Sequence, residues 1–153
     1  LGEEIWNQTE GKVDAFVHSV GTAASSRGVA TVLKRHQPKI EFVAVEPAES
    51  AVLSGGSPGP HKIEGVGIGY TPPLWDPALA DKILEVKTDD AKAMARRLAR
   101  EEALFAGTSS GANVVAAIRV AQRLGPGATV VTLMADSGLK YLSTDVYKDG
   151  RTP

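Results

Sequence analysis

The chain has 153 residues, 42% of them hydrophobic, which is enough to bury one sizeable core and fits one domain better than two. Its 17 basic and 18 acidic residues are scattered and give a formal charge of -1, which argues against nucleic acid or an anionic membrane as a partner. Cysteine is absent, which excludes disulfide scaffolds and thiolate metal sites and favours a cytoplasmic protein. No apolar run approaches the roughly 20 residues that span a bilayer.

Strands and helices are predicted to alternate from the start of the chain. Residues 13–20 are mostly apolar and β-branched or aromatic, which is typical of a strand buried on both faces. A helix is expected to begin at Ser25 or Ser26, whose hydroxyl would cap it, and to end in the basic, proline-terminated stretch 34–38. Residues 40–46 then predict a second buried strand.

The stretch between Pro47 and Pro77 is rich in glycine and proline, and irregular segments of this length are usually functional or disordered. Its apolar and aromatic residues favour a site-forming segment over a flexible linker. Residues 82–87 predict a third strand. A surface helix should follow, capped by Thr88 or Asp89, with one apolar face formed by Ala91, Met94, Ala95 and Leu98.

The last third of the chain repeats the alternation. Residues 104–107 predict a short strand, and residues 112–124 predict a helix that is apolar nearly all round, as in a helix packed against a sheet. Residues 128–135 predict the last strand, and residues 136–147 a loop with a short helix.

This alternation indicates right-handed βαβ units and therefore an α/β fold: a mostly parallel sheet with helices on both faces, in three layers. Ligands of such sheets bind outside the carboxyl ends of the strands. The rule singles out three loops, at residues 21–25, 107–111 and 135–138.

Residues 21–25, Gly-Thr-Ala-Ala-Ser, lie between a predicted strand and a predicted helix. Successive backbone N–H groups and the positive end of the helix dipole could converge there on one anion, with the Thr22 and Ser25 hydroxyls as further donors. A phosphate group suits such a site, but an ordinary turn with a serine cap explains the residues equally well. The segment matches neither a Walker loop nor the dinucleotide-binding fingerprint.

Two other glycine-containing segments are open to more than one interpretation. In residues 107–111, Ser109 or Ser110 is most simply the cap of the next helix. The alternating glycines of residues 65–69 permit either close approach to a ligand or a tight bend. The three histidines are far apart in sequence, so a metal site is not expected.

Five segments in this order, "VHSVGTAAS", "AVEP", "GPHKIEGVGIGY", "LFAGTSSGAN" and "DSGLKYLST", resemble the C-terminal half of the cysteine synthase (O-acetylserine sulfhydrylase) family. These are fold type II pyridoxal-phosphate enzymes, close to cystathionine β-synthase, and their large domain is Rossmann-like. The resemblance covers almost the whole chain.

The resemblance implies a cofactor and a set of contacts. Pyridoxal 5′-phosphate would be held through its phosphate by the segment Gly21, Thr22, Ala23, Ala24 and Ser25. Ser109 would bond the pyridine nitrogen and, being neutral, would leave that nitrogen largely unprotonated. The segment with Gly65, Val66 and Gly67 would line the substrate side. The implied reaction is β-replacement, in which an activated serine such as O-acetylserine loses its leaving group and sulfide or another thiol adds, giving L-cysteine when sulfide is used.

The chain also departs from the family pattern. The family usually has glycine at Ala23 and Ala24, which predicts loop angles that alanine tolerates, and it commonly has Glu-Arg where this chain has Leu139 and Lys140. The chain starts at Leu1 without methionine, so upstream sequence is expected. The family's Schiff-base lysine belongs to an N-terminal half outside these residues, so no catalytic residue is assigned here and the chain alone is expected to be inactive.

The resemblance implies a homodimer that acts on an amino-acid substrate and sulfide or a thiol, and a serine acetyltransferase is a conceivable partner without support in the sequence. Two alternatives remain: a sibling lyase of the cystathionine β-synthase or threonine/serine dehydratase type, and a non-catalytic module that binds an anion or a partner.

Overall fold

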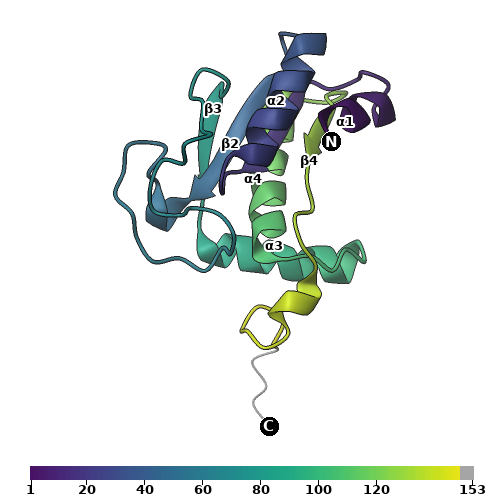
Figure 1. Ribbon diagram of the computed structural model, residues 1–153. Coiled ribbons are helices and arrows are strands. Elements are labelled where there is room, and N and C mark those ends of the chain that lie inside the picture. The colour runs from purple at the N-terminus through teal and green to yellow at the C-terminus, as the bar shows by residue number, and fades with distance from the viewer. Residues whose placement is uncertain (149–153) are drawn as a thin grey trace.

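The computed structural model describes residues 1–148, which fold around a four-stranded parallel sheet (Figure 1). The strand order is β3-β2-β1-β4, all neighbours run parallel, and the predicted α/β fold class is confirmed. The strands are β1 (Ala15–Ser19), β2 (Glu41–Pro47), β3 (Lys82–Val86) and β4 (Val130–Thr132).

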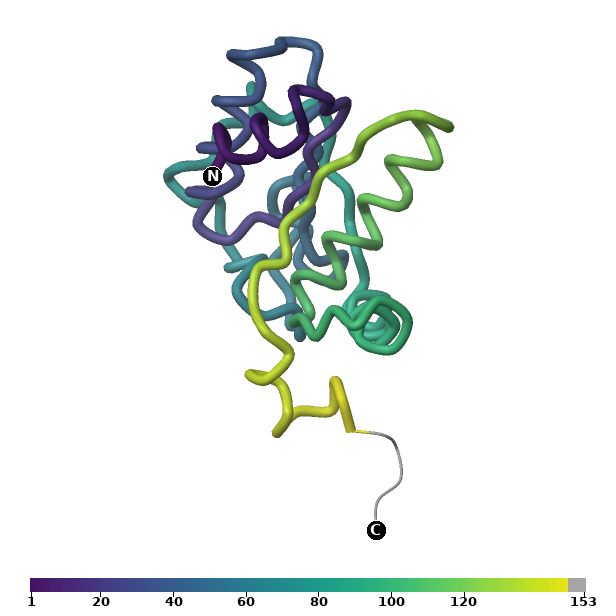
Figure 2. Tube along the Cα trace, turned by 90° about the vertical axis from the view of Figure 1, so that its right-hand side faces the viewer, coloured from purple at the N-terminus to yellow at the C-terminus, as the bar shows by residue number. Residues whose placement is uncertain are grey.

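Four helices complete the layers: α1 (Gly2–Gln8), α2 (Ala24–His36), α3 (Thr88–Glu101) and α4 (Thr108–Leu124). Helices α1 and α2 contact each other on one face of the sheet, α4 covers the other face, and α3 crosses α4 at the lower end of the molecule (Figures 1 and 2). Helix α1 is an element that the sequence pattern did not predict. Two single turns of 3-10 helix, η1 (Ala48–Ser50) and η2 (Gly138–Tyr141), lie in the connecting segments.

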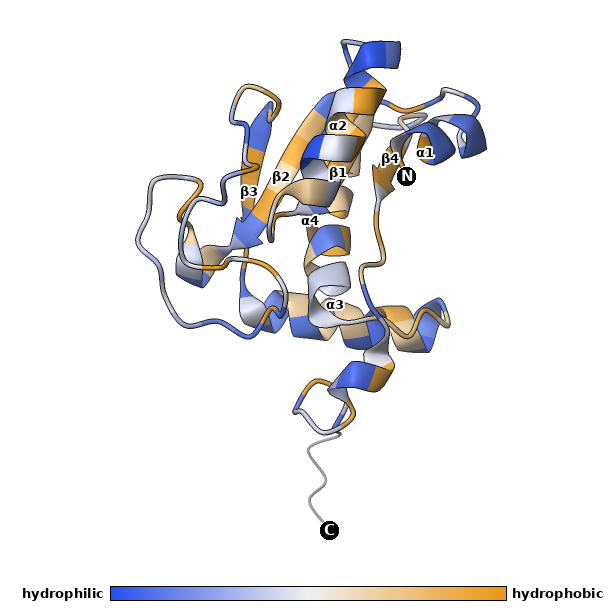
Figure 3. Cartoon of the chain, viewed as in Figure 1, coloured by the Kyte–Doolittle hydropathy of each residue, from blue (hydrophilic) through white to orange (hydrophobic). Residues whose placement is uncertain are grey.

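The two central strands, β1 and β2, are largely apolar on both faces because both faces are covered. In β1, Phe16 packs in the cluster beneath α2, stacked on Phe42 of β2 at 5.7 Å between ring centroids, whereas Ala15 and Val17 pack in the cluster beneath α4. The hydrophobic colouring of the sheet follows from this arrangement (Figure 3). Among the described residues, none of the helices has the length and apolarity needed to cross a bilayer.

Two predicted strands differ from the structure. Residues 104–107 form no strand and make only one antiparallel bridge, between Ala106 and Ser137, because α4 begins at once at Thr108. The predicted strand 128–135 is shortened to β4, because the chain turns away from the sheet after Thr132. There the Leu133 carbonyl accepts a bond from α4 rather than from a strand.

The predicted serine and threonine caps are wrong for all three long helices. The residues that precede α2, α3 and α4 are Ala23, Lys87 and Gly107, and none of them makes a side-chain cap bond. The predicted caps are used otherwise: Ser26 donates to the Ala23 carbonyl, and Thr88 accepts from the Lys62 N–H at 3.2 Å. The N-terminus of α3 is instead capped from a distant segment, because Glu49 Oε1 accepts from the Thr88 N–H at 2.8 Å. Among the described residues, no side chain accepts from the first N–H groups of α2 or α4.

The irregular segment after β2 is fixed by a buried carboxylate. Glu46 is 2% exposed and accepts from the N–H groups of Leu53 (2.8 Å) and Ser54 (2.9 Å) and from the Ser54 hydroxyl. Backbone donors thus compensate its burial.

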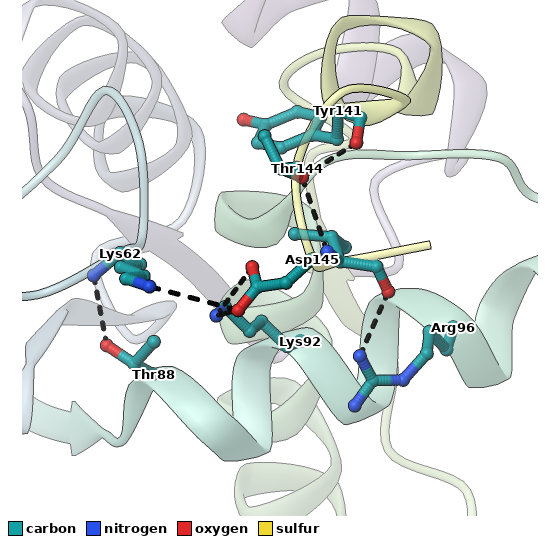
Figure 4. A network of polar contacts seen from close by, with 8 residues as sticks. Lys62, Thr88, Lys92, Arg96, Tyr141, Thr144 and Asp145 are labelled. Carbon is teal, nitrogen blue, oxygen red and sulfur yellow. Dashed lines mark hydrogen bonds and ion pairs between the residues drawn. The ribbon is translucent and has the colours of Figure 1, made fainter. Parts of the chain in front are cut away.

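The C-terminal segment is attached to α3 by charged groups (Figure 4). The buried Lys92 donates to both carboxylate oxygens of Asp145, at 2.9 and 2.8 Å, and Arg96 donates to the Val146 carbonyl at 2.9 Å. The hydrogen bond from Lys92 holds the pKa of Asp145 below its ordinary value. These contacts position the chain just after η2.

The crossing of α3 and α4 requires a glycine. A Cβ atom on Gly111 would lie 2.1 Å from the Ala91 carbonyl oxygen. We therefore predict that Gly111→Ala lowers the free energy of unfolding by roughly 1–3 kcal/mol through overpacking, measured by denaturant titration. The matched control is Gly28→Ala in α2, where no atom lies within 4 Å of the added Cβ, and where alanine should stabilise the helix by roughly 0.5–1 kcal/mol. Equal effects of the two changes would contradict this account of the crossing.

Candidate functional site

The three loops singled out by the strand-end rule meet at one pocket of about 320 Å³. The first loop, after β1, contributes Gly21, Thr22 and Ser25, the N-terminal turn of α4 contributes Ser109, and the segment after β4 contributes Ala135 and Asp136. The pocket thus lies at the carboxyl end of the two strands β1 and β4, as expected for a parallel sheet.

The loop between β1 and α2 is held by a close approach and a strained residue. A Cβ atom on Gly21 would lie 2.3 Å from the Gly65 carbonyl oxygen, so only glycine fits there. Ala23 has φ 67° and ψ 3°, in the left-handed region. The expectation that the alanines adopt comfortable angles is therefore wrong at Ala23. The side chain of Ala23 is 2% exposed and packs in the core, which offsets the strain.

The N-terminus of α2 presents unused backbone donors. Arg27 is the first residue of the helix start whose N–H finds an internal acceptor, the Ala23 carbonyl at 2.9 Å. Within residues 1–148, no internal hydrogen bond uses the N–H groups of residues 22–26. Free N–H groups and the positive end of the helix dipole favour an anion at this point.

The first turn of α4 holds two of the segments that border the pocket. Residues 108–111 belong to the helix rather than to a preceding loop. Thr108 accepts from the Glu64 N–H at 3.2 Å, and Ser110 accepts from the Ala135 N–H at 2.9 Å, so each fixes a neighbouring loop. Ser109 lies between them and lines the pocket, and its hydroxyl makes no hydrogen bond among the described residues.

The predicted substrate-side residues separate into two groups. Gly65 and Val66 line the pocket. Gly67 does not line it: its N–H donates to the Val20 carbonyl (3.1 Å) and its carbonyl accepts from His61 Nε2 (2.9 Å). The structure thus gives Gly67 a role in fixing the loop.

Several residues of the pocket have no signal in the sequence pattern. Lys140 lines it and pairs with Glu64 (3.2 Å) and Asp136 (3.7 Å), whereas the neighbouring Leu139 is exposed. Tyr141 donates to Asp136 at 2.7 Å, and burial together with this bond raises the pKa of Tyr141. Of these partners, only Glu64 comes from a distant loop, so spacing in sequence could not have indicated its pairing with Lys140.

His18 is a second such residue. It is 6% exposed, lies on β1 and lines the pocket, with Nε2 2.8 Å from the Ser25 hydroxyl oxygen. Burial lowers the pKa of His18 to about 4, so the side chain is neutral near neutral pH. Its other ring nitrogen lies 3.3 Å from Nδ2 of Asn113 on α4. In the described part of the chain, no cluster of three side chains suited to a metal ion occurs.

Comparison with known proteins identifies a family of enzymes with which the chain shares its sequence. Residues 1–136 match the family model of pyridoxal-phosphate dependent enzymes. A cysteine synthase of Staphylococcus aureus (strain N315) is 50% identical over 147 residues, covering 95% of this chain and 47% of its own length. Cysteine synthase 3 of Caenorhabditis elegans is 49% identical over 149 residues, covering 97% of this chain and 44% of its own length. The chain thus spans about half the length of these relatives.

Solved structures agree with the sequence relatives. O-acetyl serine sulfhydrylase isoform 3 from Entamoeba histolytica superposes with a TM-score of 0.92 at 40% identity, covering 99% of this chain and 46% of the other. An O-acetylserine dependent cystathionine beta-synthase from Helicobacter pylori superposes with a TM-score of 0.91 at 36% identity, covering 96% of this chain and 48% of the other. The fold is that of the fold type II enzymes, and the chain belongs to the pyridoxal-phosphate dependent enzyme family, whose cofactor is pyridoxal 5′-phosphate.

Proposed function

We propose that the protein containing this chain is a cysteine synthase, which makes L-cysteine from O-acetylserine and sulfide by β-replacement, and that this chain supplies the phosphate and pyridine-nitrogen contacts. The observation that carries the proposal is the row of free N–H groups at the N-terminus of α2, on a pocket that Ser109 also lines. The cysteine synthase relatives support the reaction type. The resemblance to that family supports a homodimer, and the absence of cysteine supports a cytoplasmic location.

The residues present fit the cofactor at its charged end. The N–H groups of residues 22–26 and the hydroxyls of Thr22 and Ser25 offer donors to a phosphate dianion, so no cationic side chain is needed there. A pocket of about 320 Å³ is within the size of small-ligand sites, roughly 300–1,000 Å³. The side-chain oxygens Ser19 Oγ and Asp136 Oδ1 are buried in this region without a hydrogen-bond partner among the described residues.

Ser109 suits the ring nitrogen because it is neutral and its hydroxyl is not used internally. A hydroxyl cannot balance a positive charge on that nitrogen as a carboxylate would, so Ser109 would leave it largely unprotonated. When bound, the cofactor draws electrons from the substrate's α-carbon, which lets the leaving group on the β-carbon depart and a thiol add. Gly65 and Val66 line the pocket and would form its wall on the substrate side, where they would help to exclude water.

The covalent anchor and the general base are assigned to sequence outside this chain. The one lysine that lines the pocket, within residues 1–148, is Lys140, and it is paired with Glu64 and Asp136. A lysine whose ammonium group is paired with two carboxylates is not available as a nucleophile. We therefore assign no catalytic residue to this chain.

The proposal is tested with the protein that contains this chain. Purified protein should absorb near the edge of the visible range through its bound cofactor, and should convert O-acetylserine and sulfide to cysteine. Serine with homocysteine, and serine or threonine alone, test the lyase alternatives. If any of these substrates is turned over faster than O-acetylserine with sulfide, the corresponding lyase assignment replaces that of a cysteine synthase. Failure to bind the cofactor at all would favour the non-catalytic module.

The phosphate site is tested by a change of charge at Thr22. We predict that Thr22→Glu lowers the affinity for pyridoxal 5′-phosphate by roughly tenfold or more, because the carboxylate would face the phosphate. Thr22→Gln is the matched neutral control and should lose much less. An acidic residue at a helix N-terminus does not destabilise the helix, so unfolding curves should be unchanged. Equal affinities of the Glu and Gln variants would show that the phosphate binds elsewhere.

A further inference from the structure

The orientation of the Asn113 side chain is determined by two backbone groups. Asn113 is fully buried on α4. Its oxygen Oδ1 accepts from the Ser19 N–H at 2.7 Å, and its Nδ2 donates to the Leu133 carbonyl at 2.8 Å. An N–H can only donate and a carbonyl can only accept, so the amide cannot be flipped.

This orientation selects one form of His18. The second hydrogen on Asn113 Nδ2 faces His18 Nδ1, 3.3 Å away, so Nδ1 must be the acceptor and carry no proton. The ring proton of neutral His18 is then on Nε2, which donates to the Ser25 hydroxyl at 2.8 Å. A proton on Nδ1 would place two donors face to face, which disfavours the charged form of the ring.

The Ser25 hydroxyl is oriented in turn. Its oxygen accepts from His18, so its own hydrogen must point to another acceptor. No acceptor for it occurs among the described residues, and Ser25 lines the pocket in the first turn of α2, beside the free N–H groups.

We propose that His18 is a positioning residue: through the fixed chain from Asn113, it holds the Ser25 hydroxyl as a donor toward the cofactor phosphate. The inference rests on the proposed function, because it takes the anion at the N-terminus of α2 to be that phosphate. His18 transfers no proton in this role. Three charged side chains line the same pocket, Glu64, Asp136 and Lys140, and none of them contacts the His18 ring within hydrogen-bond distance.

The alternative is that His18 only fills space beside Phe16, whose ring centroid lies 5.7 Å away. Two variants separate the roles. His18→Phe keeps an aromatic ring in the strand and removes the donor to Ser25. His18→Gln keeps an N–H donor at the position of Nε2.

The test measures the affinity of the cofactor-free protein for pyridoxal 5′-phosphate and, separately, for pyridoxal, which lacks the phosphate. His18→Phe should weaken binding of the phosphate form by roughly fivefold to thirtyfold, as expected for one misdirected bond to a charged group. His18→Gln should retain most of the affinity, and pyridoxal should bind all variants alike. A loss of both ligands, or equal behaviour of Phe and Gln, would overturn the positioning role.

A double-mutant cycle tests whether His18 acts through Ser25. In the Ser25→Ala background, His18→Phe should cause no further loss of affinity for pyridoxal 5′-phosphate. If the two losses multiply instead, the two residues act independently and the inference fails, although the proposed function stands. If the parent protein binds no pyridoxal 5′-phosphate, the proposed function itself fails.

One readout is independent of binding and of variants that fold poorly. Nitrogen NMR of the His18 ring in the parent protein, without cofactor, should show a protonated Nε2 and an unprotonated Nδ1. The opposite tautomer would overturn the inference even if the affinities changed as expected.

Discussion

The site depends on a helix N-terminus whose backbone N–H groups are left free at the edge of a pocket. Uncapped N–H groups cost free energy unless water or a ligand satisfies them, and this chain leaves those of residues 22–26 without an internal partner. The contact of Gly21 with the Gly65 backbone and the left-handed Ala23 fix the turn that aims them. A neutral loop can therefore hold a doubly charged group.

Helix α4 acts as the frame on which the other loops are positioned. Its first two turns carry three polar side chains that bond to neighbouring segments: Thr108 bonds to the segment at Glu64, and Ser110 and Asn113 bond to the segment at 133–135 after β4. Asn113 also accepts from the last residue of β1. Because all three are fully buried, their bonds are shielded from competing water. The close crossing with α3 at Gly111 holds this turn in place. Ser109 lies between Thr108 and Ser110, and its hydroxyl, which has no hydrogen-bond partner among the described residues, lines the pocket.

The sequence predicted the layers of the fold because burial on both faces leaves a clear pattern. The apolar runs at 13–20 and 40–46 indicated β1 and β2, and the strand-end rule brought together the three loops that form the pocket. The predicted caps at Thr88 and Ser110 were wrong because their hydroxyls have partners in distant segments, which a local pattern cannot show. The His18 and Asn113 pair spans 95 residues of sequence, so only the folded chain brings it to light.

The central claim is that backbone N–H groups of residues 22–26 hold the cofactor phosphate, and amide NMR of the protein containing this chain tests it most directly. Adding pyridoxal 5′-phosphate to the cofactor-free protein should move the amide proton resonances of residues 22–26 strongly downfield, as expected for new bonds to an anion. Adding pyridoxal without the phosphate should leave them nearly unchanged. If the phosphate form binds while these resonances stay in place, the account of the site is wrong.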